Sequence, residues 1–434
     1  MAESEEQKTE GVSEEVVQSA RWLRERFLTD RWRPRYHFCM PEDMGEPGDP
    51  NGAFYANGRY HLMYLYNRCG VGFCWGHISS IDLLHWRYHP DAIGPGNGDE
   101  GCFSGGAFLD EDGTAHLSYW MLWGPRGIGL AQSTPPYDVW TKSEANPVIR
   151  STEFGITETV DAEGAPLILG SADPSNIWKK DGVYYMLTGN LLVLNKIGRL
   201  PETPLEEQGD RLYLFESRDL KTWDYRHVFY QRNPDWTDRS EDNMCPSFLA
   251  LPTCAEGGDP SDKYLLLFIS HNIGCQYYIG TYQDDHFFPE THGRMTWADN
   301  TYFAPEALID GQGRQVMWAW LTDNPGGDKE RGWSGVYGLP RTLWLGEDNT
   351  LRISPVKEIE RLRIQPLSWQ ETSVCEETPY PLAGVVGDAC EIVIEAEVGN
   401  AQRVGIKVRC SPDYNEETLL YYDVAAKALV FDST

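Results

Sequence analysis

The chain is poor in basic residues and lacks any long apolar run. It has 37 Lys and Arg against 66 Asp and Glu, which gives a formal net charge of -29 at pH 7. Nucleic acids bind basic surfaces, so this charge excludes a nucleic-acid partner and also disfavours an anionic membrane surface. No apolar run approaches the length of a membrane-spanning helix, so no membrane partner is predicted.

The cysteines and the N-terminus lack the patterns of a zinc protein and of a secreted protein. The ten cysteines include no CxxC pair, so we predict no metal site. The opening MAESEEQKTEGVSEE has neither the basic nor the apolar segment of a signal peptide. We therefore expect a cytoplasmic protein with reduced thiols and no cofactor.

Helical patterns are nearly confined to the N-terminal extension, residues 1–30. Residues 1 to about 15 are polar and acidic, which predicts disorder. Residues 13–29 carry apolar side chains at helical spacing, which predicts a helix.

Beyond residue 30, short strands and tight turns form a repeat. Each copy has a small or Pro-containing opening, a short strand, a Gly or Asp turn and a strongly apolar strand. The five copies begin at Asp49, Phe103, Asp173, Cys245 and Phe303. Three copies continue into a segment that leads to a Trp, typical of a third and a fourth strand. This predicts a five-bladed β-propeller over residues 31–360, rather than one irregular β-sandwich.

Residues 361–434 have a different pattern. Alternation of apolar and polar residues in CEIVIEAEV and RVGIKVRC predicts strands of a second β unit. The predicted fold class is all-β, a five-bladed β-propeller followed by an incomplete β-sandwich domain.

The openings of the five copies carry the candidate chemistry. The first strand of each propeller blade lines the central channel, so the openings should meet at one end of the axis. Two of them are Asp49 and Asp173, and Glu241 and Asp242 precede a third. Carboxylates brought close together repel, so each raises the pKa of the other. Glycoside hydrolases use such a pair of carboxyl groups for catalysis. The alternatives are that Asp-Pro only makes a turn, or that a cation is bound, although no calcium loop is present.

Six short motifs stand at or near these openings. They are DPNG from Asp49, CWGHISSIDLLHW with Trp75, FSG from Phe103, DP at Asp173, CP at Cys245, and RGWSGVYGLPR ending at Arg341. In this order the sequence resembles glycoside hydrolase family 32, the β-fructofuranosidase, inulinase and levanase group. The resemblance covers roughly residues 35–350 and implies a propeller followed by a β-sandwich.

The resemblance also implies roles for individual residues. Asp49 would be the nucleophile of a retaining reaction, and Asp173 would stabilise the transition state. A Glu acid/base would stand near Cys245. The substrate, a small saccharide or a fructan, would be lined by Trp75, Phe103, Ser104 and Trp320.

Four positions depart from the family pattern, and one of them removes the expected acid. They are Gly48 for Asn, Leu65 for Gln, Ala172 for Arg and Met244 for Glu. The first three family residues normally bind the sugar that is cleaved.

Because Met244 cannot carry a proton, we predict that the acid/base is Glu241, in the loop just before it. Asp242 is the alternative in the same loop, and Glu306 is a candidate outside it.

The sequence therefore predicts a retaining glycoside hydrolase that acts on β-fructofuranosides or related small glycosides through a covalent glycosyl-enzyme intermediate. Two alternatives stay open. One is an inverting propeller glycosidase that acts on arabinofuranosides or xylosides, and the other is a non-catalytic sugar-binding propeller.

Overall fold

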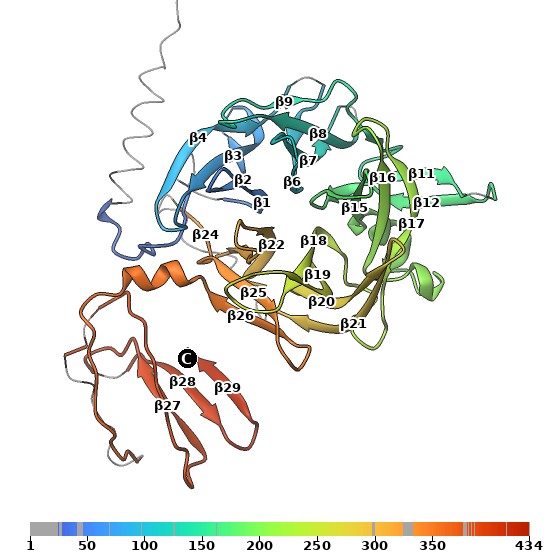
Figure 1. Ribbon diagram of the computed structural model, residues 1–434. Coiled ribbons are helices and arrows are strands. Elements are labelled where there is room, and N and C mark those ends of the chain that lie inside the picture. The colour runs from blue at the N-terminus through green and yellow to red at the C-terminus, as the bar shows by residue number, and fades with distance from the viewer. Residues whose placement is uncertain are drawn as a thin grey trace, which may run out of the picture. The chain divides into compact units, whose positions relative to one another are not determined.

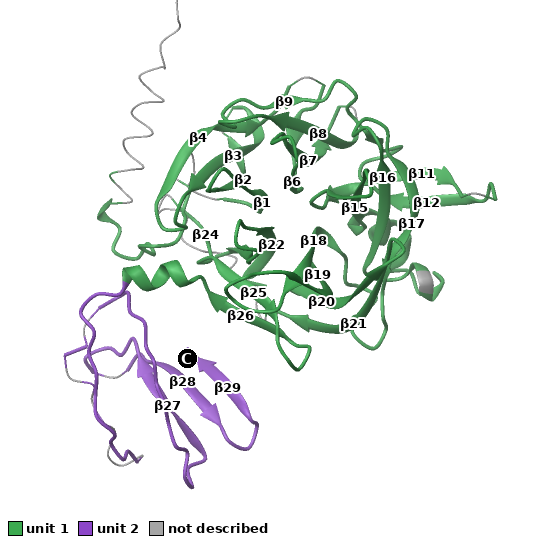
Figure 2. Cartoon of the chain, viewed as in Figure 1, with its two compact units in different colours: residues 1–362 green, residues 363–434 purple. Residues whose placement is uncertain are grey.

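The chain divides into two compact units, residues 1–362 and residues 363–434 (Figure 2). The computed structural model describes residue 25 and residues 28–433, except 41–46, 69, 97, 125, 162, 297–299, 324–332, 376–379, 381, 383, 386 and 414. The predicted disorder at 1–15 and most of the predicted helix at 13–29 lie outside the described residues. In the described part of the chain, no helix has the length and apolarity needed to cross a membrane.

Unit 1 is a five-bladed β-propeller, as predicted (Figure 1). The blades are antiparallel sheets whose strands follow one another in chain order. Blade 1 contains β1 (Pro50–Ala56), β2 (Arg59–Arg68), β3 (Gly72–Ser80) and β4 (Trp86–Ile93). Blade 2 contains β5 (Gly101–Cys102), β6 (Ala107–Leu109), β7 (Ala115–Leu122), β8 (Gly127–Ser133), β9 (Thr141–Lys142) and β10 (Ile149–Arg150).

The remaining blades follow the same plan. Blade 3 contains β13 (Ala172–Pro174), β14 (Trp178–Lys180), β15 (Val183–Gly189), β16 (Arg211–Ser217) and β17 (Asp224–Gln231). Blade 4 contains β18 (Met244–Pro252), β19 (Pro260–Ser270), β20 (Gly274–Gln283) and β21 (His286–Arg294). Blade 5 contains β22 (Tyr302–Ile309), β23 (Gln315–Leu321), β24 (Val336–Tyr337), β25 (Arg341–Leu345) and β26 (Leu351–Pro355).

A few elements lie outside the blades of unit 1. A separate hairpin, β11 (Ile156–Val160) and β12 (Pro166–Gly170), precedes blade 3. Between β15 and β16 the chain forms the helical turns α2 (Leu191–Val193), η1 (Leu194–Gly198) and η2 (Leu205–Glu207). The last element of unit 1 is the 3-10 helix η4 (Lys357–Leu362).

Turn chemistry and burial explain why these segments form blades. Asn57 and Gly58 take φ values of 52° and 75° between β1 and β2, as a two-residue type I′ hairpin requires. Asp181 and Gly182 do the same in blade 3, with φ values of 51° and 76°. All residues of β7 are buried, because a middle strand of a blade is covered by neighbouring blades on both faces.

Side chains join neighbouring blades near the axis. The amide of Asn51 accepts from the Gly105 N–H at 3.2 Å, which ties blade 1 to blade 2. In the same way Asn176 accepts from the Phe248 N–H at 2.8 Å and donates to the Phe248 carbonyl at 3.0 Å, which ties blade 3 to blade 4. An amide can both accept and donate, so these side chains supply hydrogen bonds between blades whose strands do not pair.

The seam between blade 5 and blade 1 joins the first described strand to the last strand of unit 1. The Tyr337 N–H of blade 5 donates to the carbonyl of Phe38, which precedes blade 1, at 2.9 Å, and side chains add further contacts. The Ala53 N–H donates to the buried Glu306 carboxyl at 2.7 Å. The Tyr337 hydroxyl donates to the Gly48 carbonyl at 3.0 Å.

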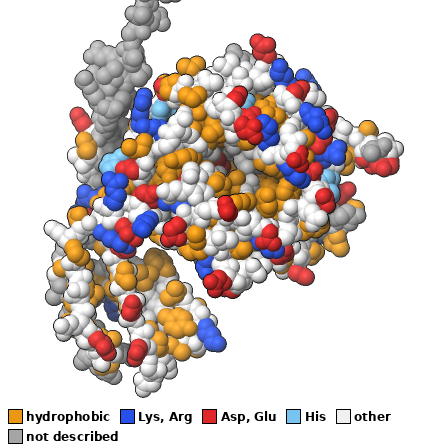
Figure 3. All heavy atoms as spheres, viewed as in Figure 1, with side chains coloured by type: hydrophobic (Ala, Val, Ile, Leu, Met, Phe, Trp, Pro, Cys, Tyr) orange, Lys and Arg blue, Asp and Glu red, His pale blue; other side chains and the backbone are white. Residues whose placement is uncertain are grey.

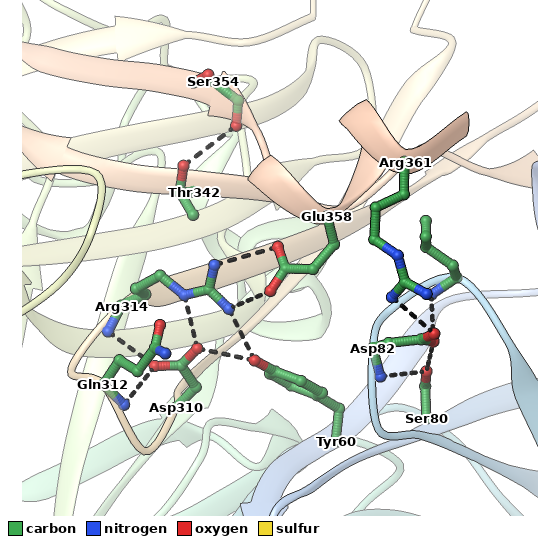
Figure 4. A network of polar contacts seen from close by, with 11 residues as sticks. Tyr60, Ser80, Asp82, Asp310, Gln312, Arg314, Thr342, Ser354, Glu358 and Arg361 are labelled. Carbon is green, nitrogen blue, oxygen red and sulfur yellow. Dashed lines mark hydrogen bonds and ion pairs between the residues drawn. The ribbon is translucent and has the colours of Figure 1, made fainter. Parts of the chain in front are cut away.

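A polar network extends this seam to η4 (Figure 4). The Tyr60 hydroxyl donates to Asp310 at 2.9 Å, and Arg314 donates to both groups at 2.8 Å. Arg314 also binds the Glu358 carboxylate with two nitrogens, at 2.8 and 3.2 Å. The buried guanidinium thus faces two carboxylates, which satisfies its charge and fixes η4 on the seam.

Unit 2 contains one antiparallel sheet in its described residues. Its strands are β27 (Arg403–Val408), β28 (Thr418–Asp423) and β29 (Ala428–Asp432). The predicted strand in RVGIKVRC is confirmed by β27. The predicted strand in CEIVIEAEV is wrong, because residues 390–398 form no strand there and Ile392, Val393 and Ile394 are exposed.

The seam yields a testable prediction at Glu306. Burial raises the pKa of this carboxyl to about 8, so it is protonated at pH 6. Glu306→Gln keeps a carbonyl acceptor for the Ala53 N–H and should change the stability little at pH 6. Glu306→Ala leaves that N–H without a partner and should cost about 1–3 kcal/mol of unfolding free energy. Urea unfolding at pH 6 measures both variants, and an equal loss in both would contradict this role.

Candidate active site

Five residues from the openings of the first strands stand at equivalent positions, one in each blade. They are Asp49, Ser104, Asp173, Cys245 and Ala304, and all but Ser104 directly precede a proline. The repeat positions predicted at Phe103 and Phe303 are therefore one residue early. The X-Pro dipeptide at residues 304–305 is the sequence signal that would have given the right register.

The backbone at three of these positions is strained. Asp173, Cys245 and Ala304 have φ values of 32°, 48° and 47°, although none is a glycine. Non-glycine residues at positive φ cost free energy, and such strain is concentrated at functional sites.

A single thiol joins the two predicted catalytic carboxylates. The Cys245 Sγ lies 3.4 Å from Asp49 Oδ2 and 3.3 Å from Asp173 Oδ2. The Ser104 hydroxyl donates to the same Asp49 oxygen at 2.5 Å. The structure thus brings together residues from blades 1, 2, 3 and 4 that are up to 196 positions apart in sequence.

Burial dominates the electrostatics of the carboxylate pair. It raises the pKa of Asp49, which donation by Ser104 and Cys245 and the charge of His271 oppose. Burial, followed by the charge of Asp49, raises the pKa of Asp173 to about 7. Near neutral pH the pair therefore favours one negative charge over two, with the ionised form best supported on Asp49.

The backbone of blade 1 holds Asp49 in place. The Leu65 N–H donates to the Asp49 carbonyl at 2.9 Å, and the Gly48 N–H donates to the Leu65 carbonyl at 2.6 Å. A Cβ atom at Gly48 would meet the Leu65 side chain at 3.3 Å. The two departures from the family pattern at these positions therefore contact each other.

The departures at Ala172 and Met244 lie in the same part of the core. Both are buried in one core cluster with Ile269 and Ala304. The positions at which the family pattern has an Arg and a Glu thus hold apolar side chains, and the charge of both groups is lost together.

The placement of Glu241 argues against its predicted role as the acid. Arg294 binds its carboxylate with two nitrogens, at 2.9 and 3.0 Å. Gln276 donates to it at 2.8 Å, and the Asp238 N–H donates at 2.9 Å. Because four donors already occupy the two oxygens of this buried carboxylate, it holds the strands of blade 4 together and has no free oxygen to offer a substrate.

The neighbouring Asp242 has a different partner. Its fully buried side chain accepts from the His271 N–H at 2.9 Å and contacts the His271 Nδ1 at 2.7 Å. His271 was missed from the sequence, where a lone histidine in a hairpin turn carries no signal. Only the fold shows that this turn lies beside the opening of β18, because Ile269 pairs with Met244.

The predicted substrate-lining aromatics differ in exposure. Trp75 is fully buried and donates its indole N–H to the Phe103 carbonyl at 3.1 Å, so it supports the site from behind instead of lining it. Phe103 and Trp320 are partly exposed. Trp320 packs edge-on against Phe303 at 6.3 Å. Figure 3 shows hydrophobic side chains gathered near the middle of unit 1 on the face that it draws.

Three histidines of blade 1, away from the carboxylate pair, have the geometry to hold a metal ion. His61, His77 and His89 offer nitrogens within 4.8 Å of one another in blade 1. The His77 and His89 rings stack at 4.1 Å, and His61 stacks on Phe54 at 4.5 Å. Burial lowers the pKa of His61 to about 3 and that of His77 to about 2, so both rings are neutral. Stacked neutral rings also suit the packing of a blade interior.

The raised pKa of Asp173 predicts a pH-dependent change in stability. The unfolded carboxyl ionises near its ordinary value of 3.8, whereas the folded one stays protonated to about 7. Wild-type stability is therefore lost between these two values as the pH rises. Asp173→Asn removes this loss, so its melting temperature relative to wild type should rise by several degrees from pH 4 to pH 7 and then level off.

Thermal unfolding at a series of pH values provides the measurement. Asp219→Asn is the control, because backbone N–H donors lower the pKa of the exposed Asp219. This variant should show no such rise. A constant melting-temperature difference for Asp173→Asn across the pH range would show that folding leaves the pKa of Asp173 at its ordinary value.

The comparisons with known proteins cover almost the whole chain. The description "Glycosyl hydrolases family 32 N-terminal domain" matches residues 40–355, and "Glycosyl hydrolases family 32 C terminal" matches residues 358–434. Sucrose-6-phosphate hydrolase of Zymomonas mobilis is 26% identical over 94% of this chain and 78% of its own length. Fructan 1-exohydrolase of Triticum urartu is 30% identical over 79% of this chain, which spans 57% of that relative.

A solved structure supports the fold. The β-fructofuranosidase BmSUC1 of Bombyx mori superposes with a TM-score of 0.68 at 20% sequence identity, over 96% of this chain and 84% of that one. Both family descriptions together match most of the sequence, in the order of the two units. The chain therefore belongs to glycosyl hydrolase family 32.

Proposed function

We propose that this protein is a retaining glycosidase that hydrolyses β-fructofuranosides. The observation that carries the proposal is the meeting of Asp49 and Asp173 at one thiol, in a chain that belongs to family 32. Curated relatives named as sucrose-6-phosphate hydrolase, levanase and fructan 1-exohydrolase support the fructoside substrate class. The chain spans 57% of the length of the Triticum fructan 1-exohydrolase and 58% of the length of the Bacillus levanase. The activity of the whole protein is therefore part of this proposal.

In the proposed mechanism, the two carboxylates have separate roles. Asp49 attacks the anomeric carbon, because its oxygen is held by the Ser104 hydroxyl and its ionised form is the better supported one. Asp173 binds a sugar hydroxyl or stabilises the oxocarbenium charge of the transition state. The covalent fructosyl-enzyme is then hydrolysed by water with retention of configuration.

The environment of the pair also bears on the sugar. Gly48, Leu65 and Ala172 provide no polar side chain where the family pattern has Asn, Gln and Arg. Fewer side-chain hydrogen bonds to the cleaved sugar favour substrates in which the aromatic side chains Phe103 and Trp320 contribute contact area. We include a cytoplasmic location in the proposal, which the free thiols of the described cysteines support.

One observation favours a second candidate function. Met244 is buried and apolar where the family pattern has its acid. A propeller without an acid would bind a saccharide without cleaving it. Titration calorimetry with sucrose and with inulin, alongside an assay for released reducing sugar, separates a binder from an enzyme.

The nucleophile assignment is tested by Asp49→Ala. Turnover of sucrose, inulin and levan should fall by at least about 10⁴-fold, because no other group can form the covalent intermediate. Circular dichroism and thermal unfolding should show an intact fold. Proton NMR of the first product anomer of the wild type should show retention. Near-wild-type kcat in the variant, or an inverted anomer, would overturn the assignment.

A further inference from the structure

The tip of one hairpin in blade 4 stands beside the carboxylate pair. Ser270 ends β19 and Gly274 begins β20, and His271 lies in the turn between them. Ile269 pairs with Met244, the residue before Cys245, so the turn adjoins the opening of β18. His271 interacts electrostatically with both Asp49 and Asp173.

Asp242 fixes the orientation of the His271 ring. One carboxylate oxygen accepts from the His271 backbone N–H at 2.9 Å, and the other lies 2.7 Å from Nδ1. The Asp242 side chain is fully buried, whereas the His271 side chain is 44% exposed. Because Nδ1 carries the proton donated to this carboxylate, Nε2 is the nitrogen left to exchange a proton with a substrate.

Two further contacts hold the histidine at this place. Asn300 donates to the His271 carbonyl at 2.8 Å. The His271 ring stands edge-on to Phe303 at 5.8 Å, and Phe303 in turn packs against Trp320. The imidazole thus has the aromatic side chain of Phe303 on one side, stays partly open to solvent, and is close enough to both aspartates for their charges to act on it.

We propose that His271, oriented by Asp242, is the acid/base of the reaction, in place of the carboxylic acid absent at Met244. This inference rests on the proposed function. It assigns His271 as a catalytic residue and Asp242 as a positioning residue.

The two steps balance with this assignment. In the first step, an Asp49 oxygen forms a bond to the anomeric carbon while the bond to the leaving oxygen breaks, and the protonated Nε2 gives its proton to that oxygen. In the second step, the neutral Nε2 takes a proton from water as the water oxygen bonds to the anomeric carbon, and the Asp49 carboxylate leaves. The ring ends protonated, as it began.

The charges around the ring suit a proton donor at neutral pH. Burial lowers the pKa of His271, but the hydrogen bond and charge of Asp242 and the charges of Asp173 and Asp49 raise it above its ordinary value of 6.5. Met244, Ile269 and Phe303, which pack around the turn, carry no charge. Protonation of the ring is therefore favoured more than in a free histidine, and the activity should fall as the pH rises past the pKa of His271.

The test compares two substrates in His271→Gln. Sucrose has a poor leaving group that needs a proton, whereas the nitrophenolate of a nitrophenyl β-fructofuranoside leaves without one. We expect kcat/KM for sucrose to fall by about 10²–10⁴-fold, with a far smaller loss for the first step on the aryl substrate. The alkaline limb of the wild-type profile of kcat/KM against pH should disappear. Added azide should speed release of the fructosyl group by replacing the water that His271 activates.

Asp242→Asn tests the positioning role. It removes the negative charge at Nδ1, so the alkaline limb should move to lower pH while the limb itself remains. A merely structural role would lower stability and leave the position of the limb unchanged.

Matched controls come from the same chain. His85 has the same local pattern as His271, because its backbone N–H and its Nδ1 both contact Asp82 at 2.9 Å, and it lies exposed in blade 1. His85→Gln should leave both substrates and the pH profile unchanged. Glu241→Gln tests the other acid in the loop and should change kcat/KM for both substrates by the same factor.

The outcomes separate the two levels of the proposal. Wild-type turnover with an unchanged substrate ratio and an unchanged alkaline limb in His271→Gln would overturn the role of His271 alone. Selective loss on sucrose in Glu241→Gln would return the acid to Glu241. No turnover of either substrate by the wild type would overturn the proposed function, and this inference with it.

Discussion

Two carboxylates that share one thiol are the constraint on which the rest of the site depends. Asp49 and Asp173 come from blades 1 and 3, and burial disfavours a negative charge on either. Ser104 and Cys245 donate to them from the blades between and beyond. The propeller supplies this arrangement because its first strands bring equivalent positions to one axis, where strained backbone at Asp173 and Cys245 directs the side chains inward.

Replacements around this pair occur as packed partners. Gly48 leaves just enough room for the Leu65 side chain, and Ala172 lies in the same apolar cluster as Met244. A single polar residue introduced at one of these positions would lack a hydrogen-bond partner. Burying such a group costs more folding free energy than burying an apolar side chain there. Apolar residues thus surround the pair at these positions, and the nearby charges are concentrated on the two aspartates and on the ion pair of Asp242 with His271.

The sequence predicted the architecture better than the individual contacts. Turn dipeptides such as Asn57-Gly58 and the repeated openings depend on local chemistry, so five blades and the positions of Asp49 and Asp173 could be read directly. The direction of a loop side chain is set by partners far along the chain. Glu241 binds Arg294 and Gln276, and Trp75 donates to the Phe103 carbonyl. None of these partners is a sequence neighbour of the residue that it binds. His271 was out of reach for the same reason.

The seam of the ring ties the nucleophile to the two ends of the propeller. Asp49 follows Gly48, whose carbonyl is held by Tyr337 of blade 5, and no strand among the described residues crosses from one of these blades to the other. Transient separation of blades 1 and 5 would therefore displace the nucleophile before any other blade loosens. A circular permutant that joins these blades covalently and opens the ring between blades 2 and 3 would transfer this weakness to the connection between Ser104 and Asp173. Heating would then inactivate the permutant by separating blades 2 and 3, before the sheets themselves unfold.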